Sequence, residues 1–150
     1  MKWKLYRAGA CFIGLVSCGL FVLACGGGGS TTKVTVSESE WQIAPDVTQV
    51  KQGKVTFNVT NKGTESHEFL VVQSDLPVDG LPGADNQVNE DTIKKVVDGD
   101  PFDAGKTVSF TANLSPGKYI LICNIREQPP GQPQFNHYQK GMRTAFTVTS

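Results

Sequence analysis

The chain has 150 residues, of which 39% are hydrophobic and 19% are charged. This length and composition fit one globular domain with a single core. Basic and acidic residues number 14 each, and there is neither a basic run nor an interleaving of Lys or Arg with aromatic residues. The pattern therefore argues against a nucleic-acid partner.

Residues 1–24 are predicted to be a lipoprotein signal peptide. The segment opens with three basic residues, Lys2, Lys4 and Arg7. An apolar stretch without charge runs from 8 to 24 and ends in Val22-Leu23-Ala24-Cys25, the pattern of a bacterial lipobox. In that pattern the cysteine is lipidated and becomes the mature N-terminus. An earlier match at Cys18 would leave an apolar segment on the mature end, so Cys25 is preferred. An uncleaved signal anchor is the alternative.

Residues 25–32 are predicted to be a lipidated cysteine with a flexible tether, because four glycines and a serine follow Cys25. The lipid would hold the protein on the extracytoplasmic side of a bacterial membrane, in the periplasm or on the outer surface. Loss of the leader leaves 11 basic and 14 acidic residues, a net charge of −3. It also leaves Cys123 as the only cysteine of the domain at 33–150, which therefore cannot form an internal disulfide.

Alternating apolar and polar residues predict a domain built from β-strands. Strands are expected at 33–36, 55–59, 67–72, 107–112, 118–125 and 142–148. Turn sequences separate several of them, such as Asn61-Lys62-Gly63 and Leu114-Ser115-Pro116-Gly117. Residues 126–136 are rich in proline and glutamine, and we expect them to project as an unpaired loop.

The alternation breaks off in a long connection at 75–103. Within it, Ile93, Val96 and Val97 have helical spacing. Asn89 precedes them and is a residue type that caps helices, so one short helix is predicted here. Several short strands, turn signals and one long crossover together predict an all-β fold, a Greek-key β-sandwich with one short helix in a long connection.

The residues that can bind a soft or borderline metal are few. Besides Cys25, the mature chain contains two histidines, one cysteine and one methionine, namely His67, His137, Cys123 and Met142. Two imidazoles, a thiolate and a weak axial thioether suit both Cu(I) and Cu(II) with little rearrangement. Three of the four residues lie within 123–142, across a strand end, a loop and a strand start. This grouping favours a site for one mononuclear copper ion.

Each of these residues also has a structural explanation when it is taken alone. A cysteine or a methionine in a β-strand is usually core filler, His67 shares a strand face with apolar residues, and His137 suits a polar loop. A metal-free interaction domain therefore stays an alternative. An enzyme with Cys123 as nucleophile and His137 as base is another, although no nucleophile-elbow pattern occurs and no helix is expected after Cys123. Two histidines cannot build a trinuclear copper cluster, and a binuclear thiolate-bridged centre needs a second cysteine.

The sequence resembles the cupredoxins, the plastocyanin-like family of small blue copper proteins. The resemblance rests on His67 in NKGTESHEFLVV, Cys123 in PGKYILICNI, and His137 and Met142 in NHYQKGM, and it covers roughly residues 33–149. It implies that these four residues hold one copper ion. It also implies that the protein is not an enzyme but carries single electrons between larger redox partners, as a monomer.

The sequence departs from the family pattern at two places. Thirteen residues, 124–136, separate Cys123 from His137, whereas family members have only a few there. The site can form only if this insert returns close to where it leaves. Many members also have an asparagine after the early histidine that helps to tie the ligand segments together. Glu68 stands there in this chain, and Asn124 is expected to supply a compensating hydrogen bond.

The resemblance further implies where electrons leave the protein. In the family the second histidine lies near the surface, so His137 is expected to be the port, with Phe135 and Tyr138 shaping the docking face. The partners would be redox proteins of a respiratory or photosynthetic chain, met at a membrane to which the lipid on Cys25 anchors the protein. The alternative is a copper carrier or storage lipoprotein that delivers copper to an oxidase without cycling it.

Overall fold

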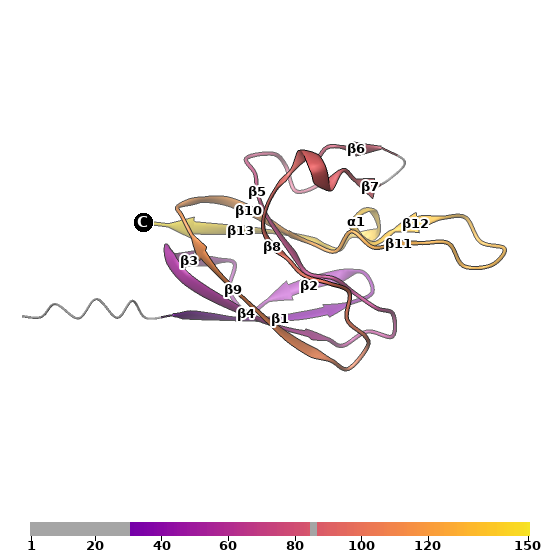
Figure 1. The fold of residues 1–150 in the computed structure, drawn as a ribbon, viewed down its shortest axis with the longest axis horizontal. Helices are drawn as coiled ribbons and strands as arrows, with labels where there is room; N and C mark the ends of the chain where they lie inside the picture. Colours follow the sequence, from indigo (N-terminus) through magenta and orange to yellow (C-terminus); the bar gives the residue numbers. More distant parts are fainter. Residues whose placement is uncertain (1–30, 85–86) are drawn as a thin grey trace, which may run out of the picture.

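The computed structural model describes residues 31–84 and 87–150. Two β-sheets pack against each other, and a short hairpin projects from one end (Figure 1). The predicted signal peptide, the lipidation of Cys25 and most of the tether lie outside the described residues. Within the described ranges, no helix has the length and apolar character needed to cross a membrane.

The first sheet has four strands in the order β2-β1-β4-β9. Their bounds are β1 Thr32–Ser39, β2 Gln42–Pro45, β4 Gly53–Asn61 and β9 Thr107–Leu114. β1 runs parallel to β4, and the other pairs are antiparallel. In β4 the buried Val55, Phe57 and Val59 alternate with partly exposed polar residues, which is the pattern of a strand with one face on a core.

The second sheet has five strands in the order β3-β13-β10-β5-β8. Their bounds are β3 Gln49–Lys51, β5 Leu70–Gln73, β8 Lys94–Asp98, β10 Gly117–Ile122 and β13 Arg143–Thr149. β13 runs parallel to β3, and the other pairs are antiparallel. Residues 119–122 of β10 are all buried, so this central strand is covered on both faces.

Two apolar clusters cover the two faces of β10. The larger one lies between the sheets, where the ring of Phe57 packs 5.4 Å from Phe69 and 5.5 Å from Phe146, measured between ring centroids. The smaller one covers the outer face of the second sheet, where Leu81 and Tyr138 pack on residues of β5 and β10. The fold is therefore the all-β sandwich that the sequence predicts.

The helix predicted around 93–97 is absent, and a strand takes its place. Asn89 does act as a cap, because its side chain accepts the N–H of Asp91 at 3.1 Å, but the capped element is a single 3₁₀ turn, η1 (Glu90–Thr92). The chain then pairs with β5 as β8. Hydrogen bonds to a neighbouring strand thus outweigh the local helical spacing. Among the described residues, the α-helix is α1 (His137–Lys140).

The insert at 126–136 also differs from the expectation of an unpaired loop. Its ends form two short antiparallel strands, β11 (Arg126–Glu127) and β12 (Phe135–Asn136), with Arg126 opposite Asn136. The three prolines lie between these strands, where no ladder hydrogen bond is needed. The insert therefore projects as a hairpin (Figure 1) and returns the chain to the point where it left.

One buried acid interrupts the apolar interior. Glu38 in β1 has no exposed surface, and neither of its carboxyl oxygens has a hydrogen-bond partner among the described residues. Burial, reinforced by the charge of Glu68, raises the pKa of Glu38 to about 9. Because an unpaired buried carboxylate is costly, the side chain is neutral near pH 7.

Glu38 gives the metal-free protein a predictable pH dependence. The unfolded chain releases this proton near the ordinary pKa of 4.5, whereas the folded chain holds it to about 9. The contribution of Glu38 to the free energy of unfolding should therefore be largest below about pH 5 and should fall as the pH rises toward about 9. In urea unfolding, Glu38→Gln should be more stable than the unaltered protein at about pH 8, with a gap that closes near pH 5. A gap that does not change with pH would contradict this assignment.

Candidate metal centre

Three residues from distant parts of the chain meet at one end of the sandwich. His67 lies ahead of β5, Cys123 follows β10 directly, and His137 opens α1. One ligand atom from each lies within 4.8 Å of the other two, and none of the three side chains has exposed surface. The sequence predicted this convergence across the insert.

The distances within the cluster suit a single metal ion. Nδ1 of His67 lies 3.3 Å from Nδ1 of His137, and Sγ of Cys123 lies 3.4 Å from the same Nδ1 of His137. Nitrogen and sulfur ligands stand about 2.0–2.3 Å from a first-row ion, so two ligands of a trigonal site lie roughly 3.5–3.8 Å apart. Two imidazoles and a thiol at this spacing fit one mononuclear copper ion.

Backbone hydrogen bonds fix His67. Its N–H donates to the carbonyl of Phe102 at 3.2 Å, and its carbonyl accepts the N–H of Phe102 at 2.8 Å. The pair forms an isolated bridge outside the main ladders. The segment after β8 therefore holds this imidazole in place.

A second set of backbone bonds closes the segment that carries the other candidates. The N–H of His137 donates to the carbonyl of Ile125 at 2.9 Å, across the base of the hairpin. The N–H of Met142 donates to the carbonyl of His137 at 3.0 Å, and the carbonyl of Met142 accepts the N–H of Cys123 at 3.2 Å. Met142 is fully buried in the same core cluster as Cys123. The loop thus ties all three positions together.

The electrostatics of the cluster favour a cation. Burial raises the pKa of the Cys123 thiol, although the N–H of Glu68 donates to its sulfur at 3.4 Å. Burial also lowers the pKa of both His67 and His137, so both rings are neutral near pH 7. Neutral imidazoles have a lone pair for a metal, and a bound cation stabilises the thiolate that burial otherwise opposes.

Glu68 and Asn124, the residues that follow His67 and Cys123, are joined by a hydrogen bond. Oε1 of Glu68 accepts the backbone N–H of Asn124 at 2.8 Å. The side chain of Asn124 turns elsewhere, to Val88 and Glu90. Burial raises the pKa of Glu68 to about 7. The carboxyl group of Glu68 and the backbone N–H of Asn124 therefore link the segment of His67 to that of Cys123, without the side-chain amide of Asn124.

The expected docking residues have different surroundings. The hydroxyl of Tyr138 donates to the carbonyl of Val78 at 2.7 Å and accepts the N–H of Leu81 at 3.2 Å, and the side chain is 4% exposed. Tyr138 therefore packs inside and offers no docking surface. Phe135 is half-buried and stacks over His137 with 6.1 Å between ring centroids.

The family resemblance led us to expect His137 near the surface. In the structure its side chain is buried. The ring of Trp41 meets it edge-on at 4.9 Å, and Oε1 of Glu127 lies 3.0 Å from its Nε2. Sequence reasoning missed both residues. Glu127 is the only acid within 124–136, which is a weak signal in hindsight. Trp41 lies between β1 and β2, so only the folded structure brings it to the ring.

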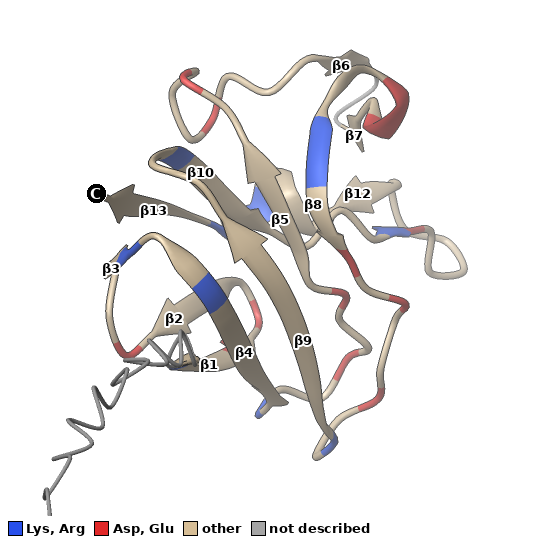
Figure 2. Ribbon diagram, turned by 60° about the vertical axis from the view of Figure 1, so that its left-hand side comes forward, with Lys and Arg blue, Asp and Glu red and all other residues tan. Residues whose placement is uncertain are grey.

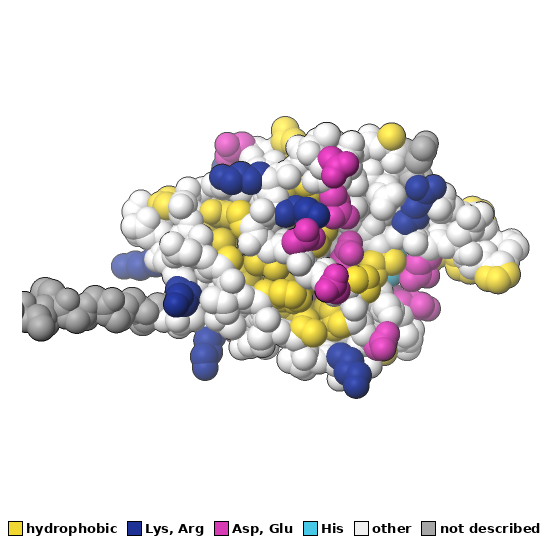
Figure 3. All heavy atoms as spheres, viewed as in Figure 1, with side chains coloured by type: hydrophobic (Ala, Val, Ile, Leu, Met, Phe, Trp, Pro, Cys, Tyr) yellow, Lys and Arg dark blue, Asp and Glu magenta, His cyan; other side chains and the backbone are white. Residues whose placement is uncertain are grey.

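Acidic side chains are common near this end of the domain. Figure 2 shows most Asp and Glu residues on connecting segments, and Figure 3 shows a band of acidic side chains on the face that leads toward the hairpin. The charges of Glu40, Glu65 and Glu127 all act on His137.

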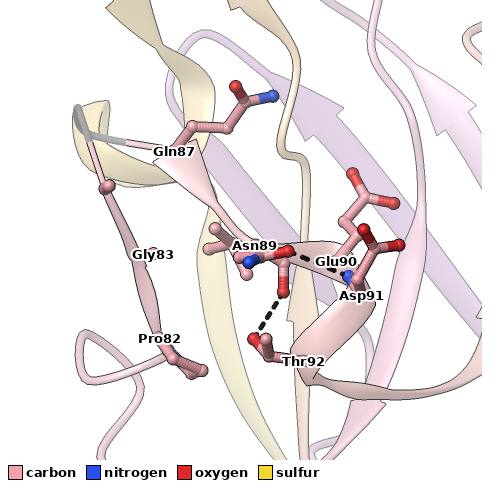
Figure 4. Close-up of a pocket in the computed structure, with 9 residues that line it drawn as sticks. Pro82, Gly83, Gln87, Asn89, Glu90, Asp91 and Thr92 are labelled. Atoms are coloured by element: carbon pink, nitrogen blue, oxygen red, sulfur yellow. Dashed lines mark hydrogen bonds between the residues drawn. The ribbon is translucent and has the colours of Figure 1, made fainter.

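A pocket of about 550 Å³ lies apart from the cluster, lined by β6 (Gly83–Ala84), β7 (Gln87–Val88) and η1 (Figure 4).

Comparisons with known proteins give a consistent picture of the fold. No protein-family model and no curated protein matches the chain. Solved structures do match. Auracyanin from Roseiflexus castenholzii is 22% identical with a TM-score of 0.51, covering 80% of this chain and 97% of that one. Auracyanin A from Chloroflexus aurantiacus, a "blue" copper protein, is 18% identical with a TM-score of 0.54, covering 80% and 100%.

Reduced rusticyanin is a further match, 22% identical with a TM-score of 0.51 and 81% of each chain covered. At these identities the likeness concerns the arrangement of the strands. It agrees with the two-sheet topology described above. The chain therefore has the cupredoxin fold.

Proposed function

We propose that the protein is a blue copper protein that carries single electrons between extracytoplasmic redox partners. The observation that carries this proposal is the buried cluster of two imidazoles and one thiol whose ligand atoms lie within 4.8 Å of one another. The likeness in fold to auracyanin A, described as a "blue" copper protein, supports it.

The ligands in this proposal are Nδ1 of His67, Nδ1 of His137 and Sγ of Cys123, with the thioether of Met142 as the weak axial ligand. Full burial of Met142 beside Cys123 in the core supports its role. Copper bound there would hold or release one electron by changing between Cu(II) and Cu(I). The backbone bonds around the ligands keep the donor atoms in place, so neither state requires the protein to rearrange.

The enzymatic alternative is weaker, although the thiol of Cys123 and the ring of His137 do lie at hydrogen-bond distance. A nucleophilic cysteine is partly exposed and has a lowered pKa. Cys123 has no exposed surface, and burial raises its pKa. A thiol in this state suits a metal ligand better than a nucleophile.

The copper-carrier alternative would be favoured by an open site from which the ion leaves easily. The hairpin instead covers His137 with Phe135 and Glu127, and the ring of Trp41, which packs against Phe135, also contacts it. A closed site retains its ion, which favours electron transfer.

The lipid on Cys25 and the glycine-rich tether would keep the protein near its partners at the membrane and raise their effective concentration. The partners would be redox proteins of a respiratory or photosynthetic chain, met one at a time by a monomer. The auracyanins that share the fold come from photosynthetic bacteria, which supports a photosynthetic setting.

The first test is the visible absorption spectrum after addition of Cu(II). The unaltered protein should turn intensely blue with one copper per chain, and Cys123→Ser should abolish the colour because the thiolate is lost. Cys25→Ser is the matched control, since it removes the other mature cysteine and should keep the colour. A blue Cys123→Ser protein would rule out the ligand assignment.

Substitutions of Met142 test the axial position. Met142→Gln should keep the blue colour and lower the reduction potential, because a harder oxygen donor favours Cu(II). Met142→Leu should raise the potential, because it removes the donor. Each shift should be at least about 59 mV, a tenfold change in a one-electron equilibrium. Potentials that stay equal in all three proteins, measured by voltammetry, would remove Met142 from the ligand set.

Shortening of the hairpin tests the closed site. Replacement of residues 127–135 by two glycines should speed the loss of Cu(I) to a chelator at least tenfold, because His137 loses its cover. Deletion of residues 129–133 shortens only the tip and should leave the rate unchanged. Equal rates in all three proteins would show that the hairpin does not retain the ion.

A further inference from the structure

Glu127 on β11 faces the ring of His137 from the hairpin. Its Oε1 lies 3.0 Å from Nε2 of His137, which is a hydrogen-bond distance. An ionised carboxylate only accepts hydrogen bonds, so the proton of the neutral ring sits on Nε2. Nδ1 then carries the lone pair, and Nδ1 is the atom that faces Cys123 and His67.

The hairpin ladder brings Glu127 to this place. Glu127 pairs with Phe135 across β11 and β12, and His137 follows β12 directly. Phe135 stacks over the ring, and Trp41 closes its edge. The Glu127 side chain is 24% exposed and the His137 side chain is not exposed at all. The His137 end of this contact is therefore shielded from water. A hydrogen bond to a charged acceptor is strong in such surroundings.

The other histidine lacks such a partner. Oε1 of Glu40 lies 3.6 Å from Nε2 of His67, beyond hydrogen-bond distance. That oxygen already accepts the N–H groups of Thr64 and Glu65, at 2.7 and 2.8 Å. Nε2 of His67 has no hydrogen-bond partner among the described residues. The close carboxylate contact thus belongs to His137, and the inserted hairpin supplies it.

We infer that Glu127 is a positioning residue for His137: its carboxylate accepts the Nε2 hydrogen, holds the ring with Nδ1 toward the ion and makes the imidazole a stronger donor. Carboxylates bound to ligand imidazoles act in this way in metal sites. A stronger donor favours Cu(II) over Cu(I), so Glu127 lowers the reduction potential. The effect on the potential rests on the copper site proposed above, whereas the effect on the ring tautomer does not require copper.

The first experiment uses the metal-free protein and ¹⁵N NMR of the imidazole nitrogens. The unaltered protein should show His137 with its proton on Nε2. Glu127→Ala should produce a mixture of the two tautomers, because the acceptor is gone, and Glu127→Gln should lie between, because an amide oxygen can still accept. Glu65→Gln is the matched control: it removes an acidic charge that acts on His137 without a hydrogen bond to it. An Nδ1–H tautomer in the unaltered protein would overturn the inference.

The second experiment measures the reduction potential of the copper-loaded proteins. Glu127→Gln should raise it by about 59 mV, a tenfold change in the Cu(II)/Cu(I) equilibrium, and Glu65→Gln should raise it by less than half as much. Equal shifts in the two variants would mean that charge alone acts on the ring, and would overturn the inference. Near-isosteric Gln keeps the test valid even where the Ala variant fails to fold.

The two proposals fail in different ways. A protein that takes up copper and turns blue, with the same tautomer and equal potential shifts in the two Gln variants, would leave the electron carrier standing and exclude the role of Glu127. A protein that takes up no copper would exclude the electron carrier. In that case the tautomer of metal-free His137, compared between the Glu127 and Glu65 variants, still decides whether Glu127 positions the ring.

Discussion

Three buried donor atoms that face one another are the constraint on which the rest of the structure depends. Burial opposes a charge on the His67 and His137 rings and opposes ionisation of the Cys123 thiol. A cation at their meeting point removes the conflict, because it binds neutral imidazoles and stabilises the thiolate. The sandwich supplies the rigidity that this arrangement needs: Phe102 fixes one ring, and Ile125 and Met142 fix the segment that carries the other two donors.

The insert between Cys123 and His137 changes the surroundings of the site without separating the ligands. Pairing of Arg126 with Asn136 brings both ends together, and Nδ2 of Asn136 donates to the carbonyl of Asn124 at 2.7 Å below the hairpin. The same pairing covers His137 with Phe135 and Glu127. An imidazole that resemblance places at the surface is thereby enclosed. In the proposed electron carrier, electrons that leave through His137 would pass the half-buried rings of Trp41 and Phe135.

Local sequence patterns predicted most of the strands and singled out the three side chains that the structure brings together, His67, Cys123 and His137, and contacts between distant segments account for the rest. The alternation of Val55, Phe57 and Val59 with polar residues is a local pattern. It can therefore be recognised from the sequence without knowledge of distant contacts. The spacing of Ile93, Val96 and Val97 looked helical, but β5 was available as a partner and the segment became β8. Other contacts join positions far apart in the chain, such as that of Trp41 with His137 and the hydrogen bond of Glu68 to Asn124. No pattern in a single sequence predicts such contacts.

Anomalous diffraction at the copper edge from crystals of the copper-loaded protein would locate the ion relative to His67, Cys123 and His137. We expect one strong peak per chain, bonded to Nδ1 of His67, Nδ1 of His137 and Sγ of Cys123, with the Met142 sulfur as the next nearest donor. A peak located elsewhere on the molecule, with the thiol and the two rings left unbound, would contradict this expectation.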